Sequence, residues 1–565
     1  MKKPRFMRRL FNSLILFAVL STPLIIGILG GMYSVFDPQT FGVSYSETLV
    51  VRTDEYRDDI DRDPQYARNL NRDAISTLPF LFSGLFRIDR DGQVVPDLAE
   101  TWHISQDYLT YTITLRADAT FGDGKTVTAN DVAYTLKRAA SSGTSFEATF
   151  AVRDIEGFAT FRSNGGEFTG IREIDDRTIE IALARPIQGF LYNLASYPLY
   201  IVDAGDIATN PTWYQKPNAT GPYQISAYEA GNYALLQRKD IYYGNKPSAK
   251  YVLFLYQGYT KEISANEGYA NHLYDVVKLN YFQADEFQVE TSPFYPELTA
   301  FKPWCYSYFQ LNNRNVFRDI HMRRAFNAAI ERDAYVQLYY DGDAEVSRSV
   351  FSPGMPGYST QNDYAVFDSE LSLAEALKSS VEDKRIYGRE YGFIDQSVRE
   401  YEIIGQMIRR TSAGNLVVTK FGSQFDSSYT DRIKQDFAGY RNCTVNPDPA
   451  YSLYSLISDH AGSGGNSFAI IESYRAAAVE PNTSKRIALF QELERQIMAE
   501  VPIAFTATPN DYYLVKPYVR GFNAIPGVAL PVQEMSIDGK KFYLFTAMLR
   551  ERWNNLAQLV TGNTE

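Results

Sequence analysis

The sequence has few residues of the kinds that build metal centres. Its 565 residues include only two cysteines and four histidines. Two cysteines exclude a disulfide-rich scaffold and a cysteine-built zinc module, and four scattered histidines argue against a histidine-built metal centre. We therefore expect no bound metal and no cofactor. Hydrophobic residues make up 45% and charged residues 22%. This composition excludes a disordered, collagenous or multi-span membrane protein as the main class.

An excess of positive charge is also missing. The net charge is −11, and the first 36 residues carry five positive charges and no negative one, so the rest of the chain has a net charge of −16. Such an acidic body repels nucleic-acid phosphates. We therefore expect no nucleic-acid partner.

Long uncharged runs are missing except at the N-terminus. There, residues 10–36 hold no charged side chain and follow a cluster of five basic residues. As a helix this run would span about 40 Å, more than a hydrocarbon core of about 30 Å. The basic cluster should stay in the cytoplasm, which places the C-terminal body outside the membrane. Since no A-x-A-like cleavage site follows, we expect residues 1–36 to form a membrane anchor, with a cleaved signal peptide as the alternative.

Catalytic motifs occur only as incomplete matches. Residues 124–126 read Gly-Lys-Thr, but a phosphate-binding loop needs a glycine where Ala119 stands. Residues 461–465 resemble a nucleophile elbow around Ser463, but the first glycine is replaced by Ala461. We therefore predict that the chain is not an enzyme. A hydrolase using Ser463 remains the weakest alternative.

The residue pattern indicates an α/β protein. Residues 109–115 and 179–183 alternate apolar and polar side chains, which predicts half-buried strands. Thr128 and Asp131 form a capping-box pattern ahead of a helix. Apolar stripes at helical spacing predict further helices at 319–339, from 484 onward and near 549–560.

Several stretches, in order, resemble the extracytoplasmic solute-binding proteins of peptide-type ABC transporters, the oligopeptide- and dipeptide-binding family 5. The most specific are YLTYTITLRADATFGDGKTVTANDVAYTLKR at 108–138 and ATGPYQISAYEAGNYALLQRKDIYYGNKP at 219–247. Weaker matches are LFSGLFRID at 81–89, VVPDLAETW at 94–102, FQLNNRNVFRDIHMRRAFNAAIERD at 309–333 and YYLVKPYVRGF at 512–522.

The resemblance implies a two-lobed periplasmic-binding-protein fold, type II-like, with an extra subdomain on lobe 1. It implies that two crossover strands, near Ala300 and Phe505, join the lobes. After the anchor at 1–36, the expected division is lobe 1 at 37–300 with its inserted subdomain at about 76–208, lobe 2 at 301–504, and a return to lobe 1 with a C-terminal helix at 505–565.

The resemblance also implies a function. Such proteins enclose a peptide or peptide-like ligand between their lobes and deliver it to a permease driven by ATPase subunits. This places the protein on the extracytoplasmic face of the bacterial cytoplasmic membrane, in the periplasm or at the cell surface, tethered by its N-terminal segment. The alternative is a membrane-anchored peptide sensor or chaperone-like protein on the same fold.

One segment of the family implies a ligand site with a substitution. Peptide-binding members carry A-G-W-x-A-D-Y, whose Asp neutralises the peptide amino group. The matching segment here is AGYRNCTVNPDPAY at 438–451. Gly439 and Tyr440 match, but Asn442, Cys443 or Thr444 replaces the Asp. Arg441 is new, and it either favours an anionic or blocked ligand or is merely solvated.

Four further positions are implied to contact ligand by the same resemblance, and each is otherwise a packing or surface residue: Phe425, Arg432, Phe505 and Arg72. Some members bridge two cysteines at the places of Cys305 and Cys443. The resemblance therefore implies a Cys305–Cys443 disulfide, which export to an oxidising compartment permits. Two free buried thiols are the alternative.

Overall fold

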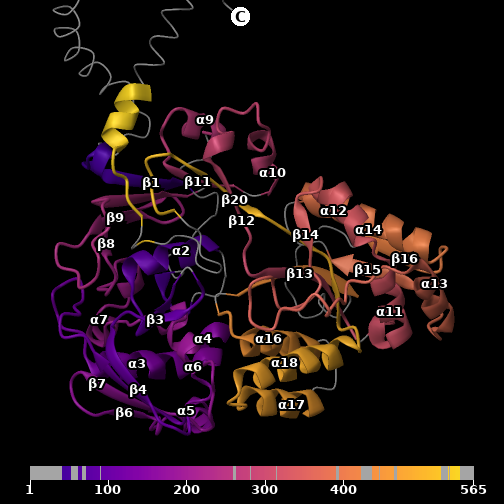
Figure 1. Cartoon of the computed structure of the whole chain (residues 1–565), viewed down its shortest axis with the longest axis horizontal. Coiled ribbons are helices and arrows are strands. Elements are labelled where there is room, and N and C mark those ends of the chain that lie inside the picture. Colours follow the sequence, from indigo (N-terminus) through magenta and orange to yellow (C-terminus); the bar gives the residue numbers. More distant parts are fainter. Residues whose placement is uncertain are drawn as a thin grey trace, which may run out of the picture.

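Two large β-sheets organise the described part of the chain, each in its own lobe (Figure 1). The computed structural model describes residues 41–52, 62–66, 72–89, 91–256, 258, 263–279, 281–313, 315–389, 394–420, 436–444, 446–462, 468–522, 532 and 535–547. Within these ranges no helix is both long and apolar enough to cross a bilayer. The predicted anchor at 1–36 and the predicted last helix near 549–560 lie outside them.

The sheet of lobe 1 has seven strands. Its inner strand β1 pairs in parallel with two neighbours and is buried at all five positions, as expected for a strand covered on both faces. The order is β12 (Leu298–Phe301), β20 (Asp511–Val515), β11 (Val276–Leu279), β1 (Thr48–Arg52), β10 (Tyr251–Leu255), β9 (Tyr233–Arg238) and β8 (Tyr223–Glu229). Helices α2 (Arg72–Leu81), α9 (Ala265–Ala270) and α10 (Tyr281–Ala284) accompany this sheet.

A subdomain is inserted into lobe 1 before β8. Its four-stranded sheet runs β4 (Ala99–Ile104), β5 (Thr110–Leu115), β7 (Thr178–Ala182) and β6 (Ile171–Glu173). The predicted strands are confirmed, since β5 and β7 bury alternate residues. Helix α3 (Ala129–Ala140) begins at the predicted capping box, in which the Thr128 N–H donates to Asp131 Oδ2 at 3.0 Å. The subdomain also contains α4 (Phe146–Val152), α5 (Phe158–Asn164), α6 (Phe190–Leu194), a 3₁₀ turn η4 (Tyr197–Leu199) and α7 (Ala204–Thr209).

The sheet of lobe 2 has five strands with helices on both faces. The strand order is β16 (Val417–Lys420), β15 (Arg385–Arg389), β17 (Phe437–Cys443), β13 (Cys305–Leu311) and β18 (Ile503–Phe505). Alternate side chains of β13 enter two cores, because neighbouring residues of a strand point to opposite faces. Phe309 and Leu311 pack against α11 (Ile320–Ala329), α12 (Arg332–Tyr340) and α14 (Ile394–Thr411), near which α13 (Ser369–Lys378) lies. Tyr306 and Tyr308 share the other core with α16 (Pro449–Gly462), α17 (Phe468–Ala478) and α18 (Thr483–Met498).

The chain passes between the two sheets twice. Residues 302–304 connect β12 to β13, and residues 506–510 connect β18 to β20. The second crossing contains β19 (Ala507–Pro509), which pairs with β14 (Ala344–Val346). Both crossings therefore lie side by side in the middle of the molecule (Figure 1).

One sequence-based prediction needs correction. The segment predicted as a single helix at 319–339 forms α11 and α12, with Ile330 and Glu331 between them. The reason is the buried guanidinium of Arg332, which donates to the carbonyl oxygens of Asn327 (2.7 Å) and Ile330 (2.9 Å) and to that of Phe505 on the edge strand β18 (2.9 Å). Burial lowers the pKa of Arg332 to about 9. The helix predicted to begin near 484 is confirmed as α18.

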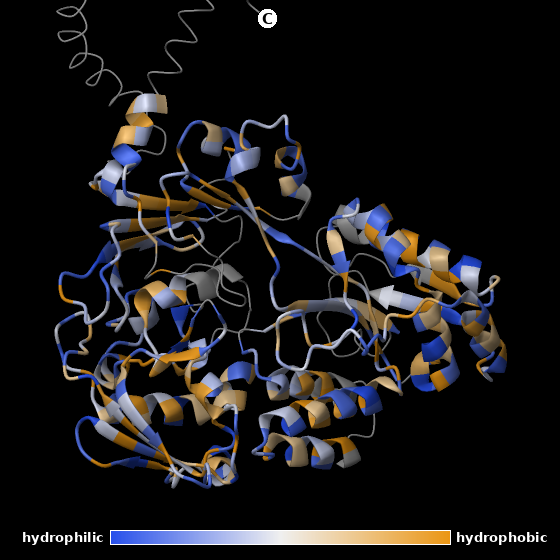
Figure 2. Cartoon of the chain, viewed as in Figure 1, coloured by the Kyte–Doolittle hydropathy of each residue, from blue (hydrophilic) through white to orange (hydrophobic). Residues whose placement is uncertain are grey.

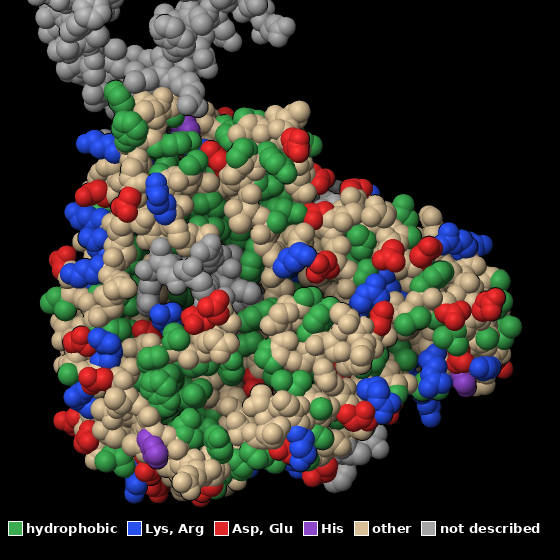
Figure 3. Space-filling view, viewed as in Figure 1, with side chains coloured by type: hydrophobic (Ala, Val, Ile, Leu, Met, Phe, Trp, Pro, Cys, Tyr) green, Lys and Arg blue, Asp and Glu red, His purple; other side chains and the backbone are tan. Residues whose placement is uncertain are grey.

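The surface agrees with the acidic but mixed composition. On the face drawn in Figure 3, acidic and basic side chains are interspersed over both lobes. Along helices α14 and α16–α18, hydrophilic and hydrophobic residues alternate, as expected for helices that cover a sheet with one face (Figure 2).

Candidate ligand-binding site

The segment 438–451, which the motif resemblance implied as a ligand site, forms β17 and the turn into α16. Strand β17 is antiparallel to β13, the first strand after the crossing into lobe 2. The register places Tyr440 opposite Tyr308, Asn442 opposite Tyr306, and Cys443 opposite Cys305. The structure thus brings together four predicted ligand residues and both cysteines: Gly439, Tyr440, Arg441, Asn442, Cys305 and Cys443.

The two cysteines are joined by a disulfide in the structure, with Cα atoms 4.0 Å apart. The bond links the first residue of β13 to the last residue of β17. It therefore fixes the end of the predicted site that lies next to the first crossing.

The predicted aromatic residues lie in the core between the β13 sheet and α16–α18. The Tyr440 ring stacks on that of Tyr308 with centroids 5.9 Å apart. Phe505, on the neighbouring strand β18, is fully buried and its ring lies 5.9 Å from that of Tyr306. Packing thus accounts for Phe505, whereas Tyr440 is half-buried and has part of its surface accessible.

Arg441 and Asn442 both have polar partners. The Arg441 guanidinium lies 3.4 Å from Asp511 and donates to the Pro509 carbonyl oxygen at 3.2 Å, so it joins β17 to the second crossing. The Asn442 side-chain amide donates to the Tyr306 hydroxyl and to Ser455 Oγ, each at 2.9 Å. The positive charge of Arg441 is therefore offset by a carboxylate of the same protein.

The one carboxylate in residues 438–451 is that of Asp448, and it is already paired with an arginine. Arg486 donates to both of its oxygens, at 2.7 and 2.9 Å, and each side chain is 6% exposed. Removing such a partner would leave an unpaired buried charge, which is costly. Asp448 is therefore a structural residue here and does not restore the missing amine-binding Asp.

The remaining predicted residues are described only in part or not at all. Arg72 is the first residue of α2, and its side chain lies outside the described part. Phe425, Arg432 and Ser463 also lie outside the described residues.

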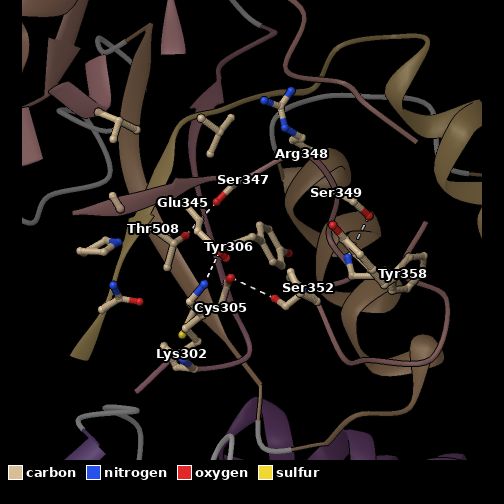
Figure 4. Close-up of a pocket in the computed structure, with 18 of the residues that line it drawn as sticks. Lys302, Cys305, Tyr306, Glu345, Ser347, Arg348, Ser349, Ser352, Tyr358 and Thr508 are labelled. Carbon is tan, nitrogen blue, oxygen red and sulfur yellow. Dashed lines mark hydrogen bonds and ion pairs between the residues drawn. The ribbon is translucent and has the colours of Figure 1, made fainter. Parts of the chain in front are cut away.

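A cavity of about 830 Å³ opens where both crossings enter lobe 2. Its walls are drawn from residues 302–306, 333–337, 344–358 and 508–510. Figure 4 shows Ser347 and Thr508 directed toward each other in its wall, and their hydroxyl oxygens are 2.8 Å apart. Ser352, also in the wall, donates to the Cys305 carbonyl oxygen at 2.9 Å. Hydroxyl groups and aromatic rings such as Tyr306 and Tyr358 make this wall amphipathic.

The charged side chains that line the cavity balance in sign: Lys302 and Arg348 against Asp333 and Glu345. Lys302 pairs with Glu345, and Arg348 pairs with Asp363, which lies outside the lining, at 2.5 Å. Because these charges offset each other, the cavity favours neither a strongly anionic nor a strongly cationic ligand by net charge.

The loop that forms one wall is held by Glu494, which the sequence did not single out. This α18 carboxylate accepts from Ser349 Oγ (2.6 Å), the Val350 N–H (2.9 Å) and the Asn362 side-chain amide (3.1 Å). Burial raises its pKa to about 7. The sequence signal was limited to the clustered serines at 347–352, which are also typical of an ordinary loop.

Two lobes joined by two adjacent extended crossings, with a cavity where they meet, define a ligand-enclosing binding protein. Comparisons with known proteins identify its family. Residues 93–413, more than half of the chain, match the profile described as bacterial extracellular solute-binding proteins, family 5. The chain belongs to this family, as its sequence motifs predicted, and is accordingly a binding protein rather than an enzyme.

Individual relatives agree with this assignment. The dipeptide-binding protein DppE of Bacillus subtilis is 30% identical over 169 residues, which are 29% of this chain and 31% of that protein. The periplasmic oligopeptide-binding protein OppA of Escherichia coli is 27% identical over 80% of this chain and 85% of its own length. Among solved structures, the murein tripeptide-binding protein MppA of Escherichia coli superposes with a TM-score of 0.71 at 19% identity, covering 87% of this chain and 97% of that one.

We predict that the disulfide contributes substantially to stability. The cysteines are 138 residues apart, so the bond restricts the unfolded chain strongly. Replacing both residues in a C305S/C443S variant should lower the free energy of unfolding by about 2–4 kcal/mol in denaturant titrations. Reductant should destabilise the wild type and leave the double variant unchanged, so the double variant serves as the control for other effects of the reductant. Two labelled thiols in native, unreduced protein would contradict the prediction.

We also predict that Glu494 makes stability depend on pH. The folded protein binds this proton more tightly than the unfolded chain does, so the contribution of Glu494 is most favourable at low pH. It should be lost as pH rises between about 4.5 and about 7. The free energy of unfolding of wild type minus that of E494Q should fall by at least about 1 kcal/mol over this range.

The control for this measurement is E492Q on the same helix. Arg495 lowers the pKa of the exposed Glu492 to about 2, so this variant should show no comparable slope above pH 4.5. If the free energy of unfolding depends on pH equally in wild type and E494Q, the Glu494 carboxylate is not buried as it is in the structure, and the prediction is wrong.

Proposed function

We propose that this chain is the extracytoplasmic substrate-binding component of an ABC importer whose ligand is a peptide or peptide-like solute. Membership of family 5 supports the importer role, and the names of its relatives, which bind dipeptides, oligopeptides and a murein tripeptide, support this ligand class. The observation that carries the proposal is the cavity at the two crossings, beside the β13–β17 pair.

The proposed mechanism is closure of one lobe on the other. The two crossings are the hinge, and a ligand held by groups from both lobes favours the closed form because it binds that form better than the open one. The closed, liganded protein is then the form that docks on the permease and its ATPase subunits. Hydroxyl groups and backbone atoms in the cavity wall suit recognition of a peptide backbone, which tolerates many side chains.

One prediction of this proposal concerns the trapped ligand. Protein beginning at Asp37, purified without denaturation from its own organism, should carry a ladder of peptide masses in native mass spectrometry. A single non-peptide mass would retain the binding role and overturn the ligand class. Protein that is empty and also ignores an added peptide mixture would favour the alternative of a sensor or chaperone-like protein on the same fold.

We further propose that residues 1–36 tether the protein to the cytoplasmic membrane. The support is the uncharged run at 10–36 after five basic residues. Full-length protein should stay in the membrane fraction after an alkaline carbonate wash and keep its N-terminus. A matched form exported with a cleavable signal and starting at Asp37 should be released. A mature N-terminus beginning within or after residues 27–31 would instead identify a signal peptide.

A further inference from the structure

Glu147 is a carboxylate at the boundary between the subdomain of lobe 1 and the helices of lobe 2. It lies in α4, beside the start of α16 (Figure 1). The rings of Phe146 and Phe150 in the same helix lie 6.2 and 4.9 Å from that of Tyr451 in α16. Tyr451 ends the segment 438–451 that replaces the family's amine-binding motif. Glu147 therefore lies against the end of this segment from the opposite lobe.

The carboxylate of Glu147 has no basic partner among the described residues. Among the described residues its one cross-lobe hydrogen bond is a long one, from the Tyr451 hydroxyl at 3.5 Å. Burial raises the pKa of Glu147; hydrogen bonds from its own backbone N–H, from Ser145 and from Tyr451 lower it, but no cation contributes. By contrast, Asp448 is paired with Arg486 and Asp511 with Arg441. A desolvated carboxylate without a cation lowers the stability of the fold. Such groups cluster at functional sites, which makes Glu147 a candidate for a functional role.

An unpaired hydroxyl lies beside it. Tyr197 in η4 is 4% exposed, and its hydroxyl has no hydrogen-bond partner among the described residues. The turn η4 packs against α4, and the Tyr451 hydroxyl reaches Glu147 directly. The negative charge of Glu147 contributes to raising the pKa of both Tyr197 and Tyr451. Tyr306, which lines the cavity at the crossings, also contributes to raising the pKa of Tyr451.

These groups match the needs of one ligand group. A primary ammonium has three N–H donors and one positive charge, and a carboxylate with phenolic oxygens supplies the charge and the acceptors. We infer that Glu147, assisted by the hydroxyl groups of Tyr197 and Tyr451, binds the ammonium group of the ligand, such as a free peptide amino terminus. This inference rests on the proposed function and identifies the charged group that this chain selects.

The position of Glu147 gives this contact a second consequence. The carboxylate belongs to lobe 1, whereas Tyr451 and Tyr306 belong to lobe 2. An ammonium bound among them bridges the lobes and so stabilises only the closed arrangement. The charge of the ligand then contributes to closure itself as well as to affinity.

The test compares two ligand pools on three variants. The pools are an equimolar mixture of tri- to pentapeptides with free amino termini and the same mixture after N-acetylation, both measured by calorimetric titration. The variants are E147Q, Y197F and the control E156Q, which changes an exposed glutamate of the same subdomain. E147Q should weaken binding of the free-amine pool by about 10- to 100-fold, because a charge-assisted bond is lost. Y197F should weaken it by a smaller factor, and E156Q should bind as wild type does.

Thermal unfolding without ligand separates this effect from misfolding. E147Q removes an unpaired, partly desolvated charge and Y197F removes an unpaired buried hydroxyl, so both variants should melt at or above the wild-type temperature. Weaker ligand binding together with unchanged or higher stability supports the inference. A lower melting temperature of both variants would assign the two groups a structural role and overturn it.

The two proposals fail in different ways. If wild-type protein binds both pools equally and E147Q changes neither affinity, the inference about Glu147 is wrong while peptide binding stands. If wild-type protein binds neither pool, the proposed ligand class is wrong and the inference falls with it.

Discussion

The structure depends on the pair of extended crossings between its two sheets. The first crossing leads directly into β13, the strand that pairs with both β17 and β18. The candidate residues on β17 and β18 are therefore one strand away from the strand that follows the first crossing. Asp343 in lobe 2 reinforces this arrangement, since it accepts hydrogen bonds from Asn510 (2.8 Å), from Gln288 (3.1 Å) and from Tyr512. The lobe closure that we propose would pivot about these contacts, and the cavity lies beside the crossings.

The buried charges divide into two groups with different consequences. Arg332 and the Asp448–Arg486 pair are each held by several hydrogen bonds at a junction: the break between α11 and α12, and the turn from β17 into α16. These hydrogen bonds offset part of their desolvation. Glu147 has hydrogen bonds but no cationic partner among the described residues, and the hydroxyl of Tyr197 in the neighbouring turn η4 has no hydrogen-bond partner there. Folding alone explains the first group. In the second group, the ligand's ammonium group supplies the missing positive charge, as we propose.

Local patterns in the sequence predicted the elements whose causes are local. The strands β5 and β7 and the capping box of α3 follow from neighbouring residues, so periodicity was sufficient. The break at Ile330 was missed because the partner that stabilises it, the Phe505 carbonyl, is 173 residues from Arg332. Glu147 was missed for the same reason, since Tyr451 is 304 residues away. The motif resemblance identified the family and the β17 segment, but it had no means of identifying a substitute group on the other lobe.

This separation across the lobes explains how the site can lose a motif residue and keep its chemistry. In a cleft closed by a hinge, a positive ligand group contacts both walls, so a carboxylate on either wall neutralises it. A carboxylate on the β17 side acts before closure, when the ligand reaches lobe 2. A carboxylate on the subdomain side, such as Glu147, makes its full contribution only after closure, when water is excluded and the interaction is strongest. If the carboxylate is on the subdomain wall instead of the β17 wall, its favourable contribution to the binding free energy is made in the closed state and not when the ligand first reaches lobe 2. The closed state is the one that we propose the permease receives, so the same exchange makes closure more dependent on the ligand's charge.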